Sequence, residues 1–305
     1  MFYFKGITMR ILSLVYVVII AIFMINEVSA ETTKILWLTD IPNDEKKFLL
    51  QQPDSIDSEI NNLILNTLTK EYELSFQVVQ IPRINLLLQT KKNACVSNRI
   101  KTPQRQRYSI YSTPIDLYLG YHLYYLKSKD DIPKTLLDKN NRLISLTSLF
   151  KTFPDRVLAI SKGRSYGKYF DEQFTTLDKK NLYSRGGSNR YESIGKMLLK
   201  GRIDYLVEFP EAINTEMNLE QNKLDLKAVG IVNSPKYILG HVACSDTPTG
   251  HKIINRINKI LAELYPKEAF YQAHTRYLNN TDIPVFNRYY QQVFHTTILH
   301  ANKPH

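Results

Sequence analysis

Short apolar runs and helix-patterned segments alternate along this chain of 305 residues, and the alternation occurs twice. Strands are expected at 33–38, 73–81, 93–100, 156–161 and 202–209, and helices at 54–70, 83–90, 165–174, 188–201 and 250–265. Asp54 or Ser55 can cap the first helix, and Asn189 and Glu192 have the spacing of a capping box. The order predicts an α/β fold in which helices flank mostly parallel sheets.

Two further β-forming runs lie at the borders of the second series: LGYHLYYL at 119–126 and KYILGHVAC at 236–244. We interpret them as strands that cross between two α/β lobes. The predicted organisation is lobe 1 at 31–122, lobe 2 at 123–238, and a return to lobe 1 at 239–305. The cleft between two such lobes is a natural site for a small molecule.

The first thirty residues have the layout of a secretory signal peptide. Lys5 and Arg10 precede an apolar run at 11–25, and small residues end the segment at Ala30. An uncleaved membrane anchor is the alternative, but the run is shorter than the roughly 20 residues that a spanning helix needs. We therefore predict that residues 1–30 are removed and that the protein is exported.

The amino-acid composition excludes only a few classes of ligand and partner. The net charge of +11 suits anionic ligands or surfaces, but charge alone identifies no partner. The seven histidines show no metal-ligand spacing, and there is no phosphate-binding loop, dinucleotide fingerprint or recognised nucleic-acid module. We expect no metal, no cofactor and no nucleic-acid partner.

The chain has two cysteines, Cys95 and Cys244. In an oxidising compartment they either form a disulfide or remain as two buried thiols. A disulfide would place both residues in one domain, with the middle of the chain inserted between them.

Residues 98–114, NRIKTPQRQRYSIYSTP, concentrate basic side chains between two prolines. Arginine suits a carboxylate because its planar guanidinium donates two parallel hydrogen bonds. Thr102 can cap a short helix with Pro103 at its first position, which would aim Arg105 at the cleft. The alternative is a solvated basic loop.

This stretch resembles the T-x-x-R…(F/Y)-S-x-P segment of bacterial extracellular solute-binding proteins of family 3. LLKGRIDYLVEFPEAI at 198–213 is similar to a second-lobe segment of the same family, and the resemblance spans most of residues 33–275. It implies the two-lobed type II periplasmic-binding-protein fold, a monomer located in the periplasm, and a membrane transporter permease or sensor as the partner.

The resemblance also implies a binding site. Arg105 would hold the ligand's carboxylate, with further contacts from the loop that contains Asn98 and Thr102 and from a second-lobe loop that contains Ser161, Gly163 and Ser165. Trp37 and Asp40, at the end of the first strand, are the other first-lobe candidates. The expected ligand is a small polar solute with a carboxylate, either amino-acid-like or an organic acid.

One position departs from the family pattern. Amino-acid binders carry an aspartate for the ligand's ammonium where this chain has Phe209, and the neighbouring Glu208 is a possible substitute. An amino-acid ligand is therefore less firmly implied than a carboxylate.

Two enzymatic alternatives stay open beside the non-enzymatic interpretation. A dehydratase-like enzyme on this fold would use Glu208 or Glu211 as acid or base. The sequence GRSYG at 163–167 also fits the nucleophile motif of serine hydrolases, with Ser165 as nucleophile and His274 or His295 as base.

Overall fold

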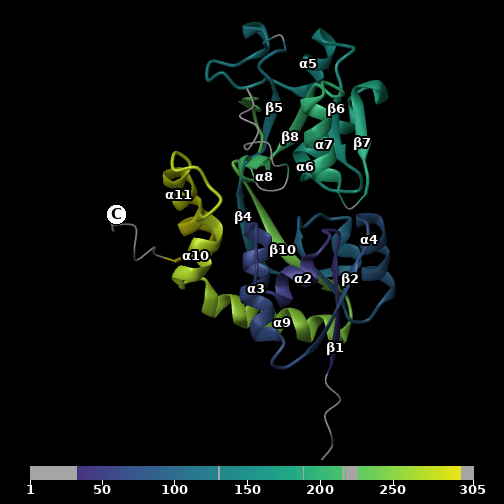
Figure 1. The fold of residues 1–305 in the computed structure, drawn as a ribbon, viewed down its shortest axis with the longest axis vertical. Helices are drawn as coiled ribbons and strands as arrows, with labels where there is room; N and C mark the ends of the chain where they lie inside the picture. The colour runs from purple at the N-terminus through teal and green to yellow at the C-terminus, as the bar shows by residue number, and fades with distance from the viewer. Residues whose placement is uncertain (1–32, 130, 188, 215–216, 218–225, 297–305) are drawn as a thin grey trace, which may run out of the picture. The chain divides into compact units, whose positions relative to one another are not determined.

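The computed structural model describes residues 33–129, 131–187, 189–214, 217 and 226–296, and the predicted signal peptide lies outside these residues. Its strands form two five-stranded sheets, which we call sheet A and sheet B (Figure 1). Sheet A has the order β2-β1-β3-β10-β4, with β1 Lys34–Thr39, β2 Glu73–Val78, β3 Ala94–Arg99, β4 Ser109–Leu119 and β10 Tyr237–Ser245. Sheet B has the order β7-β6-β8-β5-β9, with β5 His122–Leu126, β6 Leu158–Ser161, β7 Leu182–Arg185, β8 Tyr205–Glu208 and β9 Leu226–Gly230.

In each sheet, four strands run in one direction and one runs against them. In sheet A, β1 is parallel to β2 and β3, and β10 is antiparallel to both β3 and β4. In sheet B, β6 is parallel to β7 and β8, and β5 is antiparallel to β8 and β9. The predicted α/β class with mostly parallel sheets is confirmed.

Helices flank both sheets (Figure 1). Along the segments of sheet A they are α2 Asp44–Leu49, α3 Ile56–Leu68, α4 Ile81–Thr90, η1 Arg105–Arg107, α9 Pro248–Leu264, α10 Glu268–Thr275 and α11 Ile283–Phe294. Along sheet B they are η2 Lys134–Leu136, α5 Leu146–Thr152, α6 Lys168–Thr175, η3 Lys179–Asn181, α7 Arg190–Leu199 and α8 Pro210–Asn214. None of these described helices combines the length and the apolar composition that crossing a bilayer requires.

Local sequence signals explain several helix starts. Ser55 accepts a hydrogen bond from the amide of Ser58 and begins α3, as predicted. Thr247 does the same for Gly250 at the start of α9. The capping box predicted at Asn189 and Glu192 is wrong: Asn189 makes no side-chain cap bond, and Glu192 instead pairs with Lys196 on the same helix.

The predicted strand at 119–126 is two strands, because β4 ends at Leu119 and β5 begins at His122. Between them, the amide of Gly120 donates to the carbonyl oxygen of Lys236 at 2.9 Å. A Cβ at Gly120 would lie 2.3 Å from the carbonyl oxygen of Pro235, so the two connections between the sheets touch here and only glycine fits.

Sheet A is assembled from two distant segments, whereas sheet B comes from the continuous stretch between them. The structure joins Cys95 of β3 to Cys244 of β10 in a disulfide, which is one of the two alternatives that the sequence leaves open. The two residues are 149 positions apart, so the bond encloses all of sheet B.

The Tyr-rich end of the chain forms helix α11 rather than an irregular tail. Its Phe286, Tyr290 and Phe294 pack around His274 of α10, with ring centroids 5.5–5.9 Å from the imidazole. His274 is fully buried, and burial lowers its pKa to about 4. This histidine is therefore a neutral core residue.

Candidate functional site

A cavity of about 70 Å³ lies at the carboxyl-terminal ends of β1, β3 and β8. In parallel α/β sheets, these strand ends are where ligands bind. Its polar and aromatic lining consists of Thr39, Asp40, Asp57, Ser97, Asn98, Arg99, Arg105, Tyr118, Arg164, Ser165, Arg190, Tyr191 and Phe209. Four arginines facing one small cavity are its dominant chemical feature.

Arg99, the last residue of β3, and Arg105, which follows this strand, are 6% and 7% exposed. Arg105 donates from Nη1 to the carbonyl oxygen of Ile100 at 3.1 Å, and Arg99 donates from Nη2 to the side-chain oxygen of Asn85. Within the described residues, neither guanidinium forms an ion pair with a carboxylate, and Nε of Arg99 has no hydrogen-bond partner.

Burial destabilises the charged forms of Arg99 and Arg105. It lowers the pKa of Arg99 to about 10, with a further contribution from the charge of Arg105. Burial likewise lowers the pKa of Arg105. A buried charge needs a partner of opposite sign, so this pair of guanidinium groups is complementary to an anion.

Arg105 is positioned by a turn that begins at Thr102, but the predicted helix with Pro103 at its first position is wrong, because the helical residues begin only at Arg105. Thr102 Oγ1 accepts a hydrogen bond from the amide of Arg105 at 3.3 Å, and the carbonyl oxygen of Thr102 accepts from Gln106 at 3.0 Å. The turn is a single 3₁₀ turn, Arg105–Arg107.

The two arginines that follow strands of sheet B carry counterions. Arg164 donates to both carboxylate oxygens of Glu208, at 2.7 and 3.0 Å, and Glu208 is 1% exposed. Arg190, at the start of α7, forms an ion pair with Asp40, which follows β1. Burial disfavours the charge of Arg164, but Glu208 and the neighbouring tyrosines outweigh it and hold the arginine's pKa well above its usual value.

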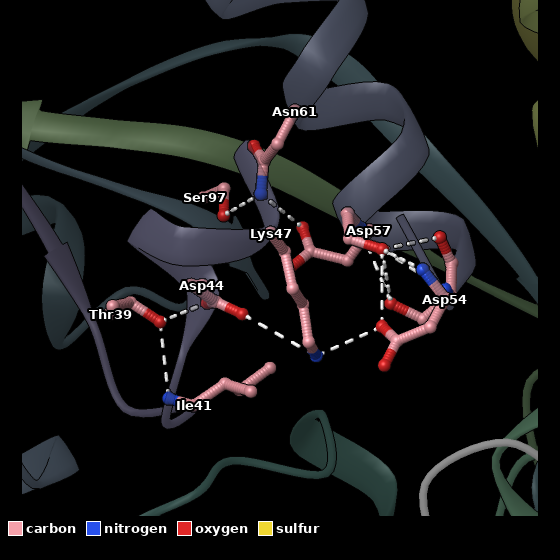
Figure 2. A network of polar contacts seen from close by, with 10 residues as sticks. Thr39, Ile41, Asp44, Lys47, Asp54, Asp57, Asn61 and Ser97 are labelled. Atoms are coloured by element: carbon pink, nitrogen blue, oxygen red, sulfur yellow. Dashed lines mark hydrogen bonds and ion pairs between the residues drawn. The ribbon is translucent and has the colours of Figure 1, made fainter. Parts of the chain in front are cut away.

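A polar network fixes the loop that presents Asp40 (Figure 2). Thr39 Oγ1 donates to the Asp44 carboxylate and accepts from the amide of Ile41 at 3.1 Å. Lys47 bridges Asp44 and Asp54, at 4.0 and 2.9 Å. Burial raises the pKa of Asp44 to about 6, although the bond from Thr39 opposes the shift.

The same view shows how a second carboxylate at the cavity is held (Figure 2). Asn61 donates from Nδ2 to Asp57 at 3.2 Å and to Ser97 at 2.9 Å. Asp57 and Ser97 both line the cavity, so this amide connects α3 to the end of β3 at the site.

Six of the nine predicted site residues line one of two adjoining spaces. Arg105, Asn98, Asp40 and Ser165 line the cavity. Thr102 and Gly163 line an adjoining groove of about 590 Å³, to which Arg105, Arg164 and Ser165 also contribute.

Three predicted residues do not line either space. Trp37 is 2% exposed and packs in the hydrophobic core, because its side chain alternates to the core side of β1. Ser161 is 1% exposed, and its amide donates to the hydroxyl of Tyr166 at 2.9 Å instead of facing a ligand. Glu208 lies behind Arg164, which occupies both of its oxygens.

The two predicted ligand loops contain Arg99 and Arg164, but neither arginine was named as a site residue, and Arg190 lies outside both loops. Arg99 is the last residue of β3, so the rule that ligands bind at strand ends was the available signal. Arg164 lies inside the GRSYG motif, in which the nucleophile pattern identifies only the serine. No local pattern marks Arg190, because its partner Asp40 is distant in sequence.

The residues named for the two enzymatic alternatives have the following partners in the structure. Ser165 Oγ donates to Asp171, and the candidate base His274 is fully buried against α11. Glu211 accepts a hydrogen bond from the amide of Leu119 at 3.2 Å, beside the connection between the sheets. Among the described residues, no cluster of histidine, cysteine and carboxylate side chains could hold a metal ion.

No family model matches the chain, and no curated protein sequence does. Solved structures do match. A mutant of ArgBP from T. maritima has 16% identity and a TM-score of 0.57, over 83% of this chain and 97% of its own. A putative L-cystine ABC transporter protein from Listeria monocytogenes has 17% identity and a TM-score of 0.56, over 83% and 98%.

A histidine kinase sensor domain with similarity to periplasmic binding proteins has 12% identity and a TM-score of 0.57, over 82% of this chain and 96% of its own. Likeness at such low identity shows the fold alone. The two five-stranded sheets with flanking helices are thus the two-lobed periplasmic-binding-protein fold.

Proposed function

We propose that this protein is a solute-binding protein that captures a small carboxylate-bearing anion on Arg99 and Arg105. The supporting observation is that two buried guanidinium groups face one cavity without a carboxylate partner among the described residues. A carboxylate would supply the missing countercharge and accept paired hydrogen bonds. The solute is an organic acid or an amino-acid-like molecule.

The mechanism in this proposal is closure around the solute. Lobe 1, at 31–122 and 239–305, would bind the anion first, and lobe 2, at 123–238, would then add contacts from Arg164, Ser165 and Arg190. Only contacts absent from the open form favour closure. The touching connections at Gly120 and Pro235 supply a natural hinge.

Export to the periplasm and a membrane partner complete the proposal. The fold neighbours include a protein described as part of an ABC transporter and a sensor domain of a histidine kinase. A transporter permease or a sensor would accordingly read the closed form, and a monomer suffices for this role. The role is binding rather than catalysis.

A thermal-shift screen against organic acids, amino acids, amines and sugars tests the proposal, followed by calorimetry on the best hit. We expect a carboxylate to bind, and Arg105→Ala to weaken that binding about 10- to 100-fold, the worth of a charge-assisted hydrogen-bonded pair. Arg107→Ala is the matched control, because Arg107 is exposed on the same turn. Equal affinities in the two variants would contradict the assignment.

A further inference from the structure

The guanidinium of Arg164 is surrounded by aromatic rings. Its central carbon lies 4.8 Å from the ring centroid of Tyr166, 5.3 Å from Phe209, 5.4 Å from Tyr191 and 5.9 Å from Tyr121. Aromatic faces attract a cation within about 6 Å of their centroids, and the attraction is largest where water is excluded. Four rings therefore lie around this one cation.

A buried carboxylate completes this arrangement. Glu208 accepts two hydrogen bonds from Arg164 and a third from the amide of Phe209, at 3.1 Å. Bidentate pairing of this kind is specific for the planar fork of a guanidinium. Four rings and one carboxylate are the chemistry by which a protein would recognise a free guanidinium or ammonium solute.

The walls of this cage also pack against one another. Tyr121 stacks on Phe209 with centroids 4.2 Å apart, and Tyr118 stacks on the same ring at 4.6 Å. Tyr166 lies 5.5 Å from Tyr121. Because these contacts do not involve Arg164, the cage walls have support that is independent of their occupant.

Arg164, which fills the cage, lies on a loop that borders the cavity and the adjoining groove. Arg164 follows Gly163, which has a φ of +78°, and the arginine side chain keeps 14% of its surface exposed. Arg164 lines both the cavity and the adjoining groove. A solute in either space would therefore reach the cage if Arg164 were absent.

We propose that Tyr121, Tyr166, Tyr191, Phe209 and Glu208 form a guanidinium-binding cage that the chain's own Arg164 fills, and that this internal occupant excludes cationic solutes. Arg164 is then a specificity-determining residue. The cage is defined by side chains within this chain, whereas its role in specificity rests on the proposed solute-binding function.

Removing the occupant tests the proposal by chemical rescue. Arg164→Ala in the full chain should lower the thermal midpoint, and methylguanidinium should restore it by several degrees while binding measurably in calorimetry. N-methylurea, which has a similar planar shape and no charge, should do neither. Methylguanidinium should bind the Arg164→Ala variant at least about tenfold more tightly than it binds the wild-type protein, a difference of roughly 1.4 kcal/mol.

A double variant, Arg164→Ala with Glu208→Gln, is the matched control. It keeps the aromatic rings but removes the carboxylate, so methylguanidinium rescue should be lost. If the single variant responds equally to methylguanidinium and to N-methylurea, or if the double variant is rescued as well as the single one, the cage assignment is overturned.

Should Arg164→Ala fail to fold alone, refolding from denaturant with and without methylguanidinium gives the same readout. A higher folded yield with the cation supports the cage, and equal yields overturn it. Methylguanidinium binding by the Arg164→Ala variant reports on the cage, whereas carboxylate binding by the protein with Arg164 in place reports on the proposed solute site, so each proposal can fail without the other.

Discussion

Sheet A and sheet B both bring buried arginines to one cavity, but they treat the charge differently. Arg164, after β6 of sheet B, is neutralised within its own lobe by Glu208. Arg99, at the end of β3 of sheet A, and Arg105, after this strand, have no carboxylate ion pair among the described residues. In our proposal, this difference separates arginines that have a structural ion pair from arginines that bind the ligand, although all are the same side chain at similar burial.

Asp116 shows how a buried acidic group can avoid an unpaired charge: it can bind a proton. Asp116 of β4 is fully buried, and neither carboxylate oxygen has a hydrogen-bond partner in the described part of the chain. Burial raises its pKa to about 8, so near neutral pH it carries a proton and little charge. Arginine cannot lose its charge in this way, so Arg99 and Arg105 need an anion instead.

The two sheets differ in construction as well. The disulfide closes sheet A across 149 residues, whereas sheet B is one continuous stretch without a cysteine. We therefore expect the largest loss of stability when the disulfide of sheet A is removed. Cys95→Ala with Cys244→Ala should cost about 4–5 kcal/mol of unfolding free energy, the entropy of closing so long a loop.

Trp37 allows the sheets to be followed separately, because it is the chain's single tryptophan and lies in β1. In urea unfolding of the cysteine variant, we expect tryptophan fluorescence to change at lower denaturant than far-ultraviolet circular dichroism, which reports both sheets. Coincident transitions, or a loss below about 1 kcal/mol, would show that the disulfide does not distinguish the sheets.

Next in size is the ion pair of sheet B. Glu208→Gln leaves the Arg164 guanidinium buried without a countercharge and should cost about 3–5 kcal/mol in urea unfolding. Glu73→Gln is the control, because Glu73 pairs with Lys34 at the surface, where both side chains are more than half exposed. Similar losses in the two variants would refute the structural role of the buried pair.

A pH series compares buried carboxyl groups, which can become neutral by binding a proton, with buried arginines, which stay charged. Burial raises the pKa of Asp116 to about 8 and that of Glu211 to about 7. Between about pH 6.5 and 8.5 the folded protein holds protons on these carboxyls that the unfolded chain has already released. Raising the pH through this window should therefore reduce stability, on the order of 1–2 kcal/mol.

The thermal midpoint at the two ends of this window measures the effect. Asp116→Asn should flatten most of the pH dependence, because the amide does not titrate. His274 does not contribute here, since its lowered pKa of about 4 places its own change in stability below about pH 6.5. A midpoint that rises with pH in the wild type would contradict the raised pKa values.

The smallest stability effect should come from Arg99. Arg99→Met removes a buried charge that has no ion pair, so we expect stability to stay within about 0.5 kcal/mol or to rise. Affinity for the carboxylate solute should fall about tenfold or more, because a charge-assisted hydrogen bond is lost. A stability loss as large as that of Glu208→Gln would erase the distinction between the two groups of arginines.

Much of the fold could be predicted from the sequence because its signals are local. The helical spacing of Ile60 and Ile64, with Ser55 as the cap, identifies α3 from a few neighbouring residues. The break at Gly120 could not be found in this way. It depends on the approach of Pro235, which is distant in sequence and close only after folding.

The site was predictable to a similar degree. Arg105 stands in a motif whose spacing and turn chemistry are visible in the sequence, and the structure places it at the cavity. Trp37 and Ser161 were plausible candidates, but the side of a strand and the hydroxyl of Tyr166 remove them from the cavity. Burial and side-chain partners are properties of the assembled chain.

By itself, the sequence determined the alternation of strands and helices and the concentration of arginine at 98–107, since both depend on short-range pattern. Only the tertiary structure decided which arginines are neutralised. Glu208 is 44 residues from Arg164, and Asp40 is farther still from Arg190. The Coulomb interaction depends on the distance between the charges and on the exclusion of water, and the local sequence determines neither of these.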